Sequence, residues 1–212
     1  MPDLLAHLAG LGADEVVLVD GGSTDGSREM LDAEGASWIS APAERARQMN
    51  AGVAHTSSGI LLFLHADTRL PAGGIDAVRA AMLDDAVAGG RFDVRLSGNR
   101  PVFQLIGFMI NLRSRLTKIS TGDQAIFVCR RAFDAVGGFP DLPLMEDVEI
   151  SKRLKQVGEI VCLRQRVSTS SRRWEEHGVW CTVWLMWQLR LRYWLGASAA
   201  ELKSRYVDQG RP

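Results

Sequence analysis

The chain has 212 residues, of which 46% are hydrophobic and 24% are charged. This composition is ordinary for a globular protein with one sizeable core, and it does not require a second domain. Lys and Arg together number 25, as do Asp and Glu, so no net positive field favours nucleic acid as a partner.

The cysteines and the ends of the chain indicate its compartment. Cys129, Cys162 and Cys181 show no metal-ligand spacing and suggest a reducing environment. The N-terminus lacks the basic start and apolar run of a signal peptide. No run reaches the roughly 18 uncharged apolar residues of a membrane-spanning helix, and the nearest, 178–189, is interrupted by Arg190. We therefore expect a cytoplasmic protein, with a peripheral position on the inner face of the membrane as an option.

Short apolar runs alternate with helical periodicity along the chain. The expected strands are 15–20, 37–40, 60–64, 89–94, 125–129 and 159–163. The expected helices are 3–12, 27–34, 44–55, 72–83, 101–118, 130–137 and 146–157. This alternation predicts an α/β fold with a mostly parallel sheet and helices on both faces, in which the later strands are antiparallel or mixed.

The stretch from Gly59 to Leu70 contains the strand around which the predicted site is arranged. Five apolar residues, 60–64, end abruptly in His65-Ala66-Asp67-Thr68, as in a strand buried inside a sheet that is covered on both faces. Ligands of open α/β sheets bind beyond the carboxyl ends of such strands. His65 and Asp67 are two residues apart, so their side chains point to the same side. Together they could hold a divalent cation that carries a phosphate.

A glycine-rich turn, Gly-Gly-Ser-Thr-Asp-Gly-Ser at 21–27, follows the strand that ends at Asp20. A strand, such a turn and a helix start form a site for phosphate or nucleotide, because backbone N–H groups and the helix dipole face the crevice. Helix capping by Ser23, Thr24 or Asp25 explains the same residues equally well. The motif alone does not decide between the two interpretations.

Glu146 and Asp147 open the helix at 146–157. The simple explanation is stabilisation of the helix dipole, typically worth about 0.3–1 kcal/mol. A Gly-Gly-Phe-Pro turn at 137–140 precedes the start of this helix, however. Asp20 and Asp67 lie at the ends of two expected strands. Acidic groups at three separate places are what a metal–phosphate site with its own general base requires.

The order of these motifs resembles the family 2 glycosyltransferases, inverting enzymes of the GT-A fold. The matching segments are VVLVDGGSTDGS (16–27), ARQMNAGVAHTSSGILLFLHADTRLP (46–71), TGDQAIFVCRRAFDAVGGFPDLPLMEDVEISKRLKQVG (121–158) and, weakly, SSRRW (170–174). Within the family, the chain is most similar to the branch called radical-SAM/selenodomain-associated transferase 2. The resemblance implies a GT-A-like (Rossmann-like) catalytic domain over residues 1–174.

The resemblance also implies roles for the matching residues. The nucleotide would be contacted by Asp20, Gly22, Ser23, Asp25, Arg47 and Asn50. Asp67 would ligate the metal, and His65, which stands in place of the first aspartate of the family's Asp-x-Asp motif, would ligate it too or contact the diphosphate. This pair suits Mn²⁺ somewhat better than two carboxylates would, with Mg²⁺ as the other candidate. Asp147 would be the general base, and Glu146 would position the acceptor or the base. Donor sugar and acceptor would approach Gly122, Asp123 and Gln124.

Two features depart from the family pattern. Of the Gln-x-x-Arg-Trp motif of processive members, Arg173 and Trp174 remain as candidate substrate contacts, but Ser170 stands in place of the glutamine. This argues against a polysaccharide synthase. The family also begins with an apolar strand beside the strand that ends at Asp20, and we expect that strand to be missing here. Without it, backbone groups would be unpaired and a nucleotide contact would be lost.

The implied reaction moves a sugar from a nucleotide-diphosphate sugar to a hydroxyl acceptor, for example a lipid or lipid-linked group, by a metal-assisted single displacement. Two alternatives stay open. A catalytically degenerate sugar-nucleotide-binding or scaffold protein is favoured by His65 and by the expected missing strand. A nucleotidyltransferase also uses an α/β nucleotide fold, but it should carry a glycine-rich, basic loop after its first strand, and none is visible.

The segment 175–212 is predicted to be an amphipathic, tryptophan-rich helical tail. Its apolar residues recur at three- and four-residue spacings, at Trp180, Trp184, Trp187, Leu191 and Trp194. One interpretation is a helix over 178–195 seated among lipid headgroups, where Trp and Arg are favoured. The other is a helix packed on the catalytic core or at a homodimer interface, with tryptophan filling space.

Overall fold

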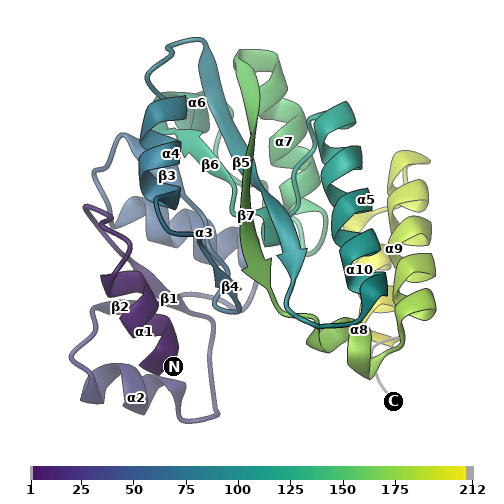
Figure 1. Cartoon of the computed structure of the whole chain (residues 1–212), viewed down its shortest axis with the longest axis horizontal. Helices are drawn as coiled ribbons and strands as arrows, with labels where there is room; N and C mark the ends of the chain where they lie inside the picture. The colour runs from purple at the N-terminus through teal and green to yellow at the C-terminus, as the bar shows by residue number, and fades with distance from the viewer. Residues whose placement is uncertain (1, 209–212) are drawn as a thin grey trace.

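Figure 1 shows a computed structural model of the chain, which describes residues 2–208. The strands are β1 (Leu18–Asp20), β2 (Trp38–Ser40), β3 (Ile60–Leu62), β4 (Thr68–Arg69), β5 (Val87–Leu96), β6 (Phe127–Cys129) and β7 (Glu159–Thr169). The helices are α1 (Pro2–Ala9), α2 (Ser27–Ala33), α3 (Arg45–Ala54), α4 (Gly74–Ala81), α5 (Pro101–Thr117), the 3-10 helix η1 (Gly122–Gln124), α6 (Arg130–Ala135), α7 (Glu146–Val157), α8 (Arg172–Glu176), α9 (Val179–Trp194) and α10 (Ala199–Asp208).

The strands form two sheets. β1 and β2 pair in parallel, and the larger sheet has the order β3-β6-β5-β7-β4. In the larger sheet β5 and β7 are parallel, whereas β6 is antiparallel to both β3 and β5, and β4 is antiparallel to β7. The predicted α/β fold with mixed pairing is confirmed. The expected predominance of parallel strands is wrong for the larger sheet.

The reversal of β6 has a local cause. After α5 the chain runs along β5 as far as η1, where the side chain of Gln124 donates a hydrogen bond to the carbonyl of Phe92. It then turns back at Ala125, whose φ of 47° lies in the left-handed region. β6 therefore enters antiparallel and pairs with Gly89 and Gly90 of β5. A side-chain contact and one unusual dihedral decide this direction, and neither is visible in the hydrophobic pattern.

The larger sheet is buried on both faces, as the central apolar run predicts. On one face Leu61 of β3 and Val128 of β6 pack with α3, α6 and α7. On the other face the neighbouring residues Ile60 and Phe127 pack with Val78 of α4. Figure 1 shows α4 in front of the sheet and α7 behind it. Successive side chains of a strand point to opposite faces, so each strand contributes to two cores.

Two differences from the expected elements arise from strand pairing. β7 continues from the expected end at 163 to Thr169, because β5 continues beside it and pairs Asp93 with Arg166 and Leu96 with Thr169. β4 has only two residues and becomes a strand through its pairing with β7.

Before β1, the described residues form α1 and no strand. β1 pairs only with β2, so the two sheets share no ladder in residues 2–208.

The C-terminal helices pack on the rest of the chain through leucines. Leu185 and Leu189 of α9 and Leu202 of α10 pack against Met145, the residue before α7. Four tryptophans of α9 are instead between 66% and 79% exposed: Trp180, Trp184, Trp187 and Trp194. The interpretation in which tryptophan fills space against the catalytic core is therefore wrong, because the buried stripe of α9 is made of leucine.

The predicted boundary between residues 174 and 175 falls within α8, and residues 209–212 of the predicted tail lie outside the described residues. Within residues 2–208, no helix combines the length and the apolarity needed to cross a membrane.

A buried charge network joins α5 to the middle of the larger sheet. Arg91 of β5 is fully buried and forms an ion pair with Asp93, which also accepts a hydrogen bond of 2.7 Å from Arg115 of α5. Asn111 of α5 donates to the carbonyl of Val94 and accepts from its N–H, at 3.0 and 2.8 Å. These bonds hold α5 along β5 at one angle and register.

We predict that Asp93→Ala lowers the free energy of unfolding by about 3–5 kcal/mol, because it leaves the buried guanidinium of Arg91 without its counter-ion. Urea unfolding followed by circular dichroism measures this loss. Asp76→Ala is the matched control, since the Asp76 side chain is 82% exposed in its pair with Arg79 and exposed pairs contribute little. Equal losses in the two variants would contradict the assigned role of Asp93.

Candidate functional site

Residues from three distant parts of the chain meet at the start of α7. The backbone N–H of Gly122 donates a hydrogen bond of 3.0 Å to Oδ2 of Asp147. Nδ1 of His65 lies 3.7 Å from Oδ1 of Asp123. Glu146, the first residue of α7, is buried beside Asp147. We call His65, Gly122, Asp123, Glu146 and Asp147 the acidic cluster; the structure brings together all five of these predicted residues.

Gly122 allows the two halves of the acidic cluster to approach each other. A Cβ placed at this position would lie 2.4 Å from Cε1 of His65 and 2.7 Å from its Nε2. Such distances are far shorter than van der Waals contact, so a side chain would displace the imidazole or η1. The sequence does show this glycine, but only the fold reveals that the imidazole of His65 lies against it.

Two residues with unusual backbone angles flank the acidic cluster. Met145, immediately before α7, has φ 69°, and Ala125, immediately after η1, has φ 47°. Non-glycine residues rarely adopt positive φ, and such strain is typically found at ligand and catalytic sites. Both residues are buried, Met145 against α9 and α10 and Ala125 in the core of the larger sheet. Packing therefore holds both turns in place.

The charges of the acidic cluster affect one another. Burial raises the pKa of Glu146, and the negative charge of Asp147 raises it further, while the positive charges of Arg45 and His65 oppose the rise. The pKa of Asp123 is lowered: burial opposes the shift, but the nearby imidazole of His65 and the positive charges of Arg45 and Arg173 outweigh it. The Asp123 side chain is 54% exposed, so the effect of burial is small. Glu146 is thus the carboxyl group that most readily keeps a proton, and Asp123 carries negative charge.

Asp67 lies exposed in the turn between β3 and β4. Its side-chain contact is a hydrogen bond of 3.4 Å from the hydroxyl of Thr68, so its carboxylate is free to take a ligand. No group of three His, Cys, Asp or Glu residues suited to a metal ion is found in the part of the chain that the structure describes. One carboxylate with an imidazole nearby fits a hard cation that takes its other ligands from substrate phosphates and water.

The glycine-rich turn is built around the buried carboxylate of Asp20. This carboxylate accepts hydrogen bonds from the N–H groups of Gly22 and Ser23 and forms an ion pair of 2.6 Å with Arg28. The Ser23 hydroxyl lowers the pKa of Asp20 most, and the Gly22 amide and Arg28 lower it further against the effect of burial. Asp25 accepts from the N–H of Ser27 at 3.2 Å, and Gly26, not Ser23, Thr24 or Asp25, is the N-cap of α2.

Three other predicted contacts bind neighbouring loops in the structure. Arg47 forms two hydrogen bonds, of 2.8 and 2.9 Å, with Asp141. Asn50 donates to the carbonyl of Phe139 and accepts from its N–H, at 2.8 and 3.0 Å. Both therefore hold the loop that leads to α7. Gln124 is fully buried and caps η1 by accepting from the N–H of Thr121.

Arg173 and Trp174 lie in α8. Arg173 donates a hydrogen bond to the hydroxyl of Tyr206 in α10, and its guanidinium stacks on that ring at 3.8 Å from the centroid. Burial lowers its pKa, and so does the charge of Arg45, while Asp123 opposes the shift. Trp174 packs against the core formed by α5 and α9. Arg173 thus faces the acidic cluster, whereas Trp174 has a packing role.

Three arginines that the sequence does not single out also lie near the acidic cluster. Arg45 opens α3, where its charge acts on Glu146, Asp123 and Arg173. Arg113 of α5 and Arg190 of α9 both lie close enough to Asp147 for its charge to raise their pKa values, although burial lowers both overall. An arginine on an amphipathic helix gives no signal of its own in a single sequence, because solvated arginines are common there.

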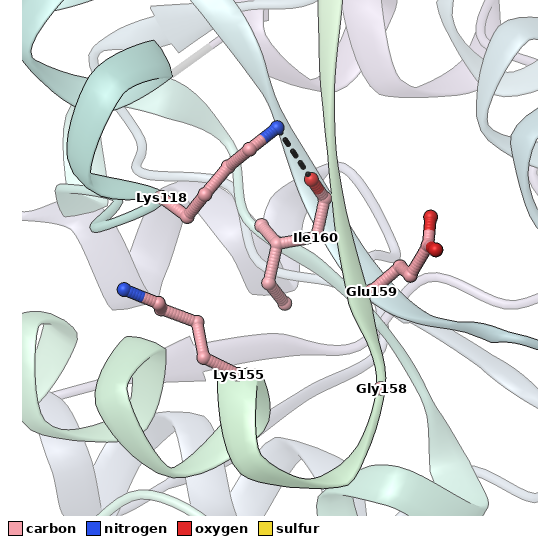
Figure 2. Close-up of a pocket in the computed structure, with 5 residues that line it drawn as sticks. All are labelled: Lys118, Lys155, Gly158, Glu159 and Ile160. Carbon is pink, nitrogen blue, oxygen red and sulfur yellow. Dashed lines mark hydrogen bonds between the residues drawn. The ribbon is translucent and has the colours of Figure 1, made fainter.

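A shallow cavity of about 260 Å³ lies elsewhere on the surface, and Figure 2 shows the residues that line it. Lys118 donates a hydrogen bond of 3.2 Å to the carbonyl of Ile160, and Lys155 projects from the last turn of α7. From Asp147 to the end of α7 the helix rises roughly 15 Å at 1.5 Å per residue. This cavity is therefore separate from the acidic cluster, and none of the predicted site residues lines it.

Several solved glycosyltransferases have a similar fold. The mannosyltransferase PcManGT from Pyrobaculum calidifontis, solved with GDP-Man and Mn²⁺, matches with a TM-score of 0.64 and 20% identity over 85% of this chain and 55% of its own. Residues 1–349 of TarS from S. aureus, solved with UDP-GlcNAc, match with a TM-score of 0.61 and 18% identity over 80% of this chain and 54% of that one. The chain spans about half the length of these structures. These likenesses confirm the GT-A fold.

The family follows from the sequence itself. The chain matches the model of glycosyl transferase family 2 over residues 3–137, which is more than half of its length, and it belongs to this family. The match includes Asp20, His65, Asp67 and Gly122 and ends before Asp147. No curated protein sequence matches the chain. The resemblance to the radical-SAM/selenodomain-associated branch stays a prediction.

We predict that Asp20→Asn lowers the free energy of unfolding at neutral pH by about 1–3 kcal/mol, because hydrogen bonds to a charged group are lost or weakened. The folded pKa of Asp20 lies below its ordinary value of 3.8. The stabilisation is therefore fully present above that value and is lost as the pH falls further. Urea unfolding between pH 7 and pH 3 should show that the difference in the free energy of unfolding between wild type and Asp20→Asn becomes smaller below about pH 4. A difference that does not change with pH would contradict the role given to the charge of Asp20.

Proposed function

We propose that the chain is an inverting glycosyltransferase that moves a sugar from a nucleotide-diphosphate sugar to an acceptor hydroxyl in a single displacement. The observation that carries the proposal is the position of Asp147. Its carboxylate is held by the N–H groups of Gly122 and Val148, at 3.0 and 2.7 Å, and lies in one cluster with His65. Membership of glycosyl transferase family 2 supports the same reaction class.

Asp147 is suited to act as the general base of this reaction. Two amide hydrogen bonds hold its carboxylate in a fixed position, where it can accept the proton of the attacking hydroxyl. Glu146 is less suited, because it is only 6% exposed and burial raises its pKa. We assign Glu146 a positioning role beside the base.

The donor would lie between the end of β3 and the glycine-rich turn. Asp67, with His65 nearby, would hold a divalent cation, Mn²⁺ or Mg²⁺. When bound, such a cation supplies Lewis acidity toward the leaving diphosphate. The Mn²⁺ found with GDP-Man in PcManGT supports this assignment. Arg45 and Arg173 would add positive charge on the side of Asp123.

We predict that Asp147→Asn lowers the transfer rate by about 10²–10⁴-fold, because the amide cannot take the proton of the acceptor hydroxyl. A panel of UDP-, GDP- and dTDP-sugars with Mn²⁺ first identifies the donor, by calorimetry and by release of nucleoside diphosphate. With that donor, the variant should keep its binding affinity and lose turnover.

Glu149→Gln is the matched control for Asp147→Asn. Glu149 lies on the same helix but forms its ion pairs with Lys152 and Arg153, away from the acidic cluster. Turnover should be nearly unchanged in this control. Unchanged turnover in Asp147→Asn would overturn the assignment of the base. If the wild-type protein bound none of the sugar nucleotides, a degenerate or scaffold role would be favoured instead.

We further propose that α5 and α9 seat the protein on a lipid surface. The two helices pack together through Phe103, Ile106 and Val179 and lie side by side in Figure 1. Their outward faces carry large apolar residues that are at least 40% exposed: Leu105, Phe108, Met109, Leu112 and Leu116 in α5, and Trp180, Trp184, Trp187, Leu191 and Trp194 in α9. Tryptophan at this density suits the headgroup region of a membrane.

We predict that the triple variant W180S/W184S/W187S binds vesicles of phosphatidylcholine and phosphatidylglycerol at least about 10-fold more weakly, because three large apolar groups no longer leave water. Vesicle co-sedimentation measures the binding, and thermal unfolding should change little, since these side chains are exposed. Leu83→Ser is the control, because Leu83 is 85% exposed beyond the end of α4. The homodimer interpretation would be favoured if the wild-type protein does not bind vesicles and instead forms a dimer that the triple variant does not form.

A further inference from the structure

Two arginines beside Asp147 have no counter-ion in the structure. Arg113 projects from α5 and Arg190 from α9, and neither forms an ion pair or a side-chain hydrogen bond with any described residue. Nε and Nη2 of Arg113 are buried and have no hydrogen-bond partner. Among the described residues, the other buried side-chain nitrogen or oxygen atoms without a partner are Nε of Arg91 and Oγ of Ser114.

Both guanidinium groups stay charged at neutral pH. Burial, followed by the charges of Arg190 and Arg91, lowers the pKa of Arg113 to about 10, against a smaller opposing effect of Asp147. Burial also lowers the pKa of Arg190, which Asp147 and Asp123 partly restore. A buried guanidinium nitrogen without a partner is costly, and the charge of Arg190 adds repulsion at Arg113.

Asp147 does not supply this partner. Its oxygens accept the N–H groups of Gly122 and Val148, and it forms no ion pair within 4 Å with either arginine. Arg91 is engaged by Asp93. An anion supplied by a ligand would therefore complete the hydrogen bonding of the buried nitrogens of Arg113.

We propose that Arg113 and Arg190 form a subsite for a phosphate group of the acceptor, which holds the acceptor hydroxyl against Asp147. The proposal rests on the glycosyltransferase function given above. A guanidinium is a flat fork of N–H donors that matches two oxygens of a phosphate. Two such forks from separate helices fit a phosphate ester better than a neutral sugar.

The position of the two arginines favours the acceptor over the donor. Arg113 and Arg190 come from α5 and α9, the helices with exposed apolar faces. An acceptor that carries both a phosphate and an apolar chain would reach the base from this side.

The test measures the affinity of the full chain for inorganic phosphate by calorimetry. Arg113→Gln and Arg190→Gln should each weaken phosphate binding by about 10-fold or more, since a charged hydrogen-bond donor is lost. Arg192→Gln is the control, because Arg192 lies on the same helix and is paired with the exposed Glu201 at 3.8 Å. It should bind phosphate like the wild type. Thermal unfolding without phosphate should be unchanged or improved in Arg113→Gln, because an unpaired buried charge is removed.

The same titration in saturating GDP or UDP with Mn²⁺ separates acceptor from donor. If phosphate still binds under these conditions and its affinity still depends on both arginines, the result supports an acceptor subsite. Phosphate displaced by the nucleotide would assign the arginines to the donor diphosphate and overturn the proposal, as would equal phosphate affinity in wild type and variants. Nucleotide binding is measured separately. If the phosphate site is absent but nucleotide binds, the proposed transferase function is unaffected. If no nucleotide binds, the result counts against the transferase function alone.

Discussion

The hydrogen bond from the Gly122 amide to the Asp147 carboxylate joins the two halves of this protein's site. It fixes the start of α7 to η1, and η1 in turn lies against the imidazole of His65 at the end of the central strand. The turn before α7 is strained at Met145, and the leucines of α9 and α10 pack on that residue. The C-terminal helices therefore support the same turn that presents Asp147.

The charged groups of the site are unevenly paired. Asp123 is close enough to Arg45 and Arg173 for their charges to lower its pKa. Arg113 and Arg190 form no ion pair with any described residue, and two donor nitrogens of Arg113 are buried without a partner. Removing water from charged groups strengthens their interaction and raises the cost of any that stay unpaired. An imbalance of this kind is typical of a binding site that is completed by its ligand, and here it lies next to the proposed base.

Helix α9 serves two purposes on opposite faces. Leu185 and Leu189 pack inward, and Arg190 is close enough to Asp147 for that charge to act on it. The tryptophans face outward. A helix with this division links the position of the site to whatever surface the tryptophans contact. If that surface is a lipid bilayer, the acceptor side of the site faces the membrane.

The sequence by itself determined the α/β class, the family and most elements, because periods of 2 and 3.6 residues are local and the GT-A motifs occur in a recognisable order. It also singled out Asp67, Gly122, Glu146 and Asp147, since strand ends and helix starts are visible in the pattern. Only the tertiary structure decided that β6 runs antiparallel, that Asp20, Asn50 and Gln124 hold loops, and that tryptophan faces outward. It alone brought Arg45, Arg113 and Arg190 to the site. The physical reason is that hydrogen-bond partners, burial and unpaired charge depend on contacts between residues far apart in the chain, which no single-sequence pattern encodes.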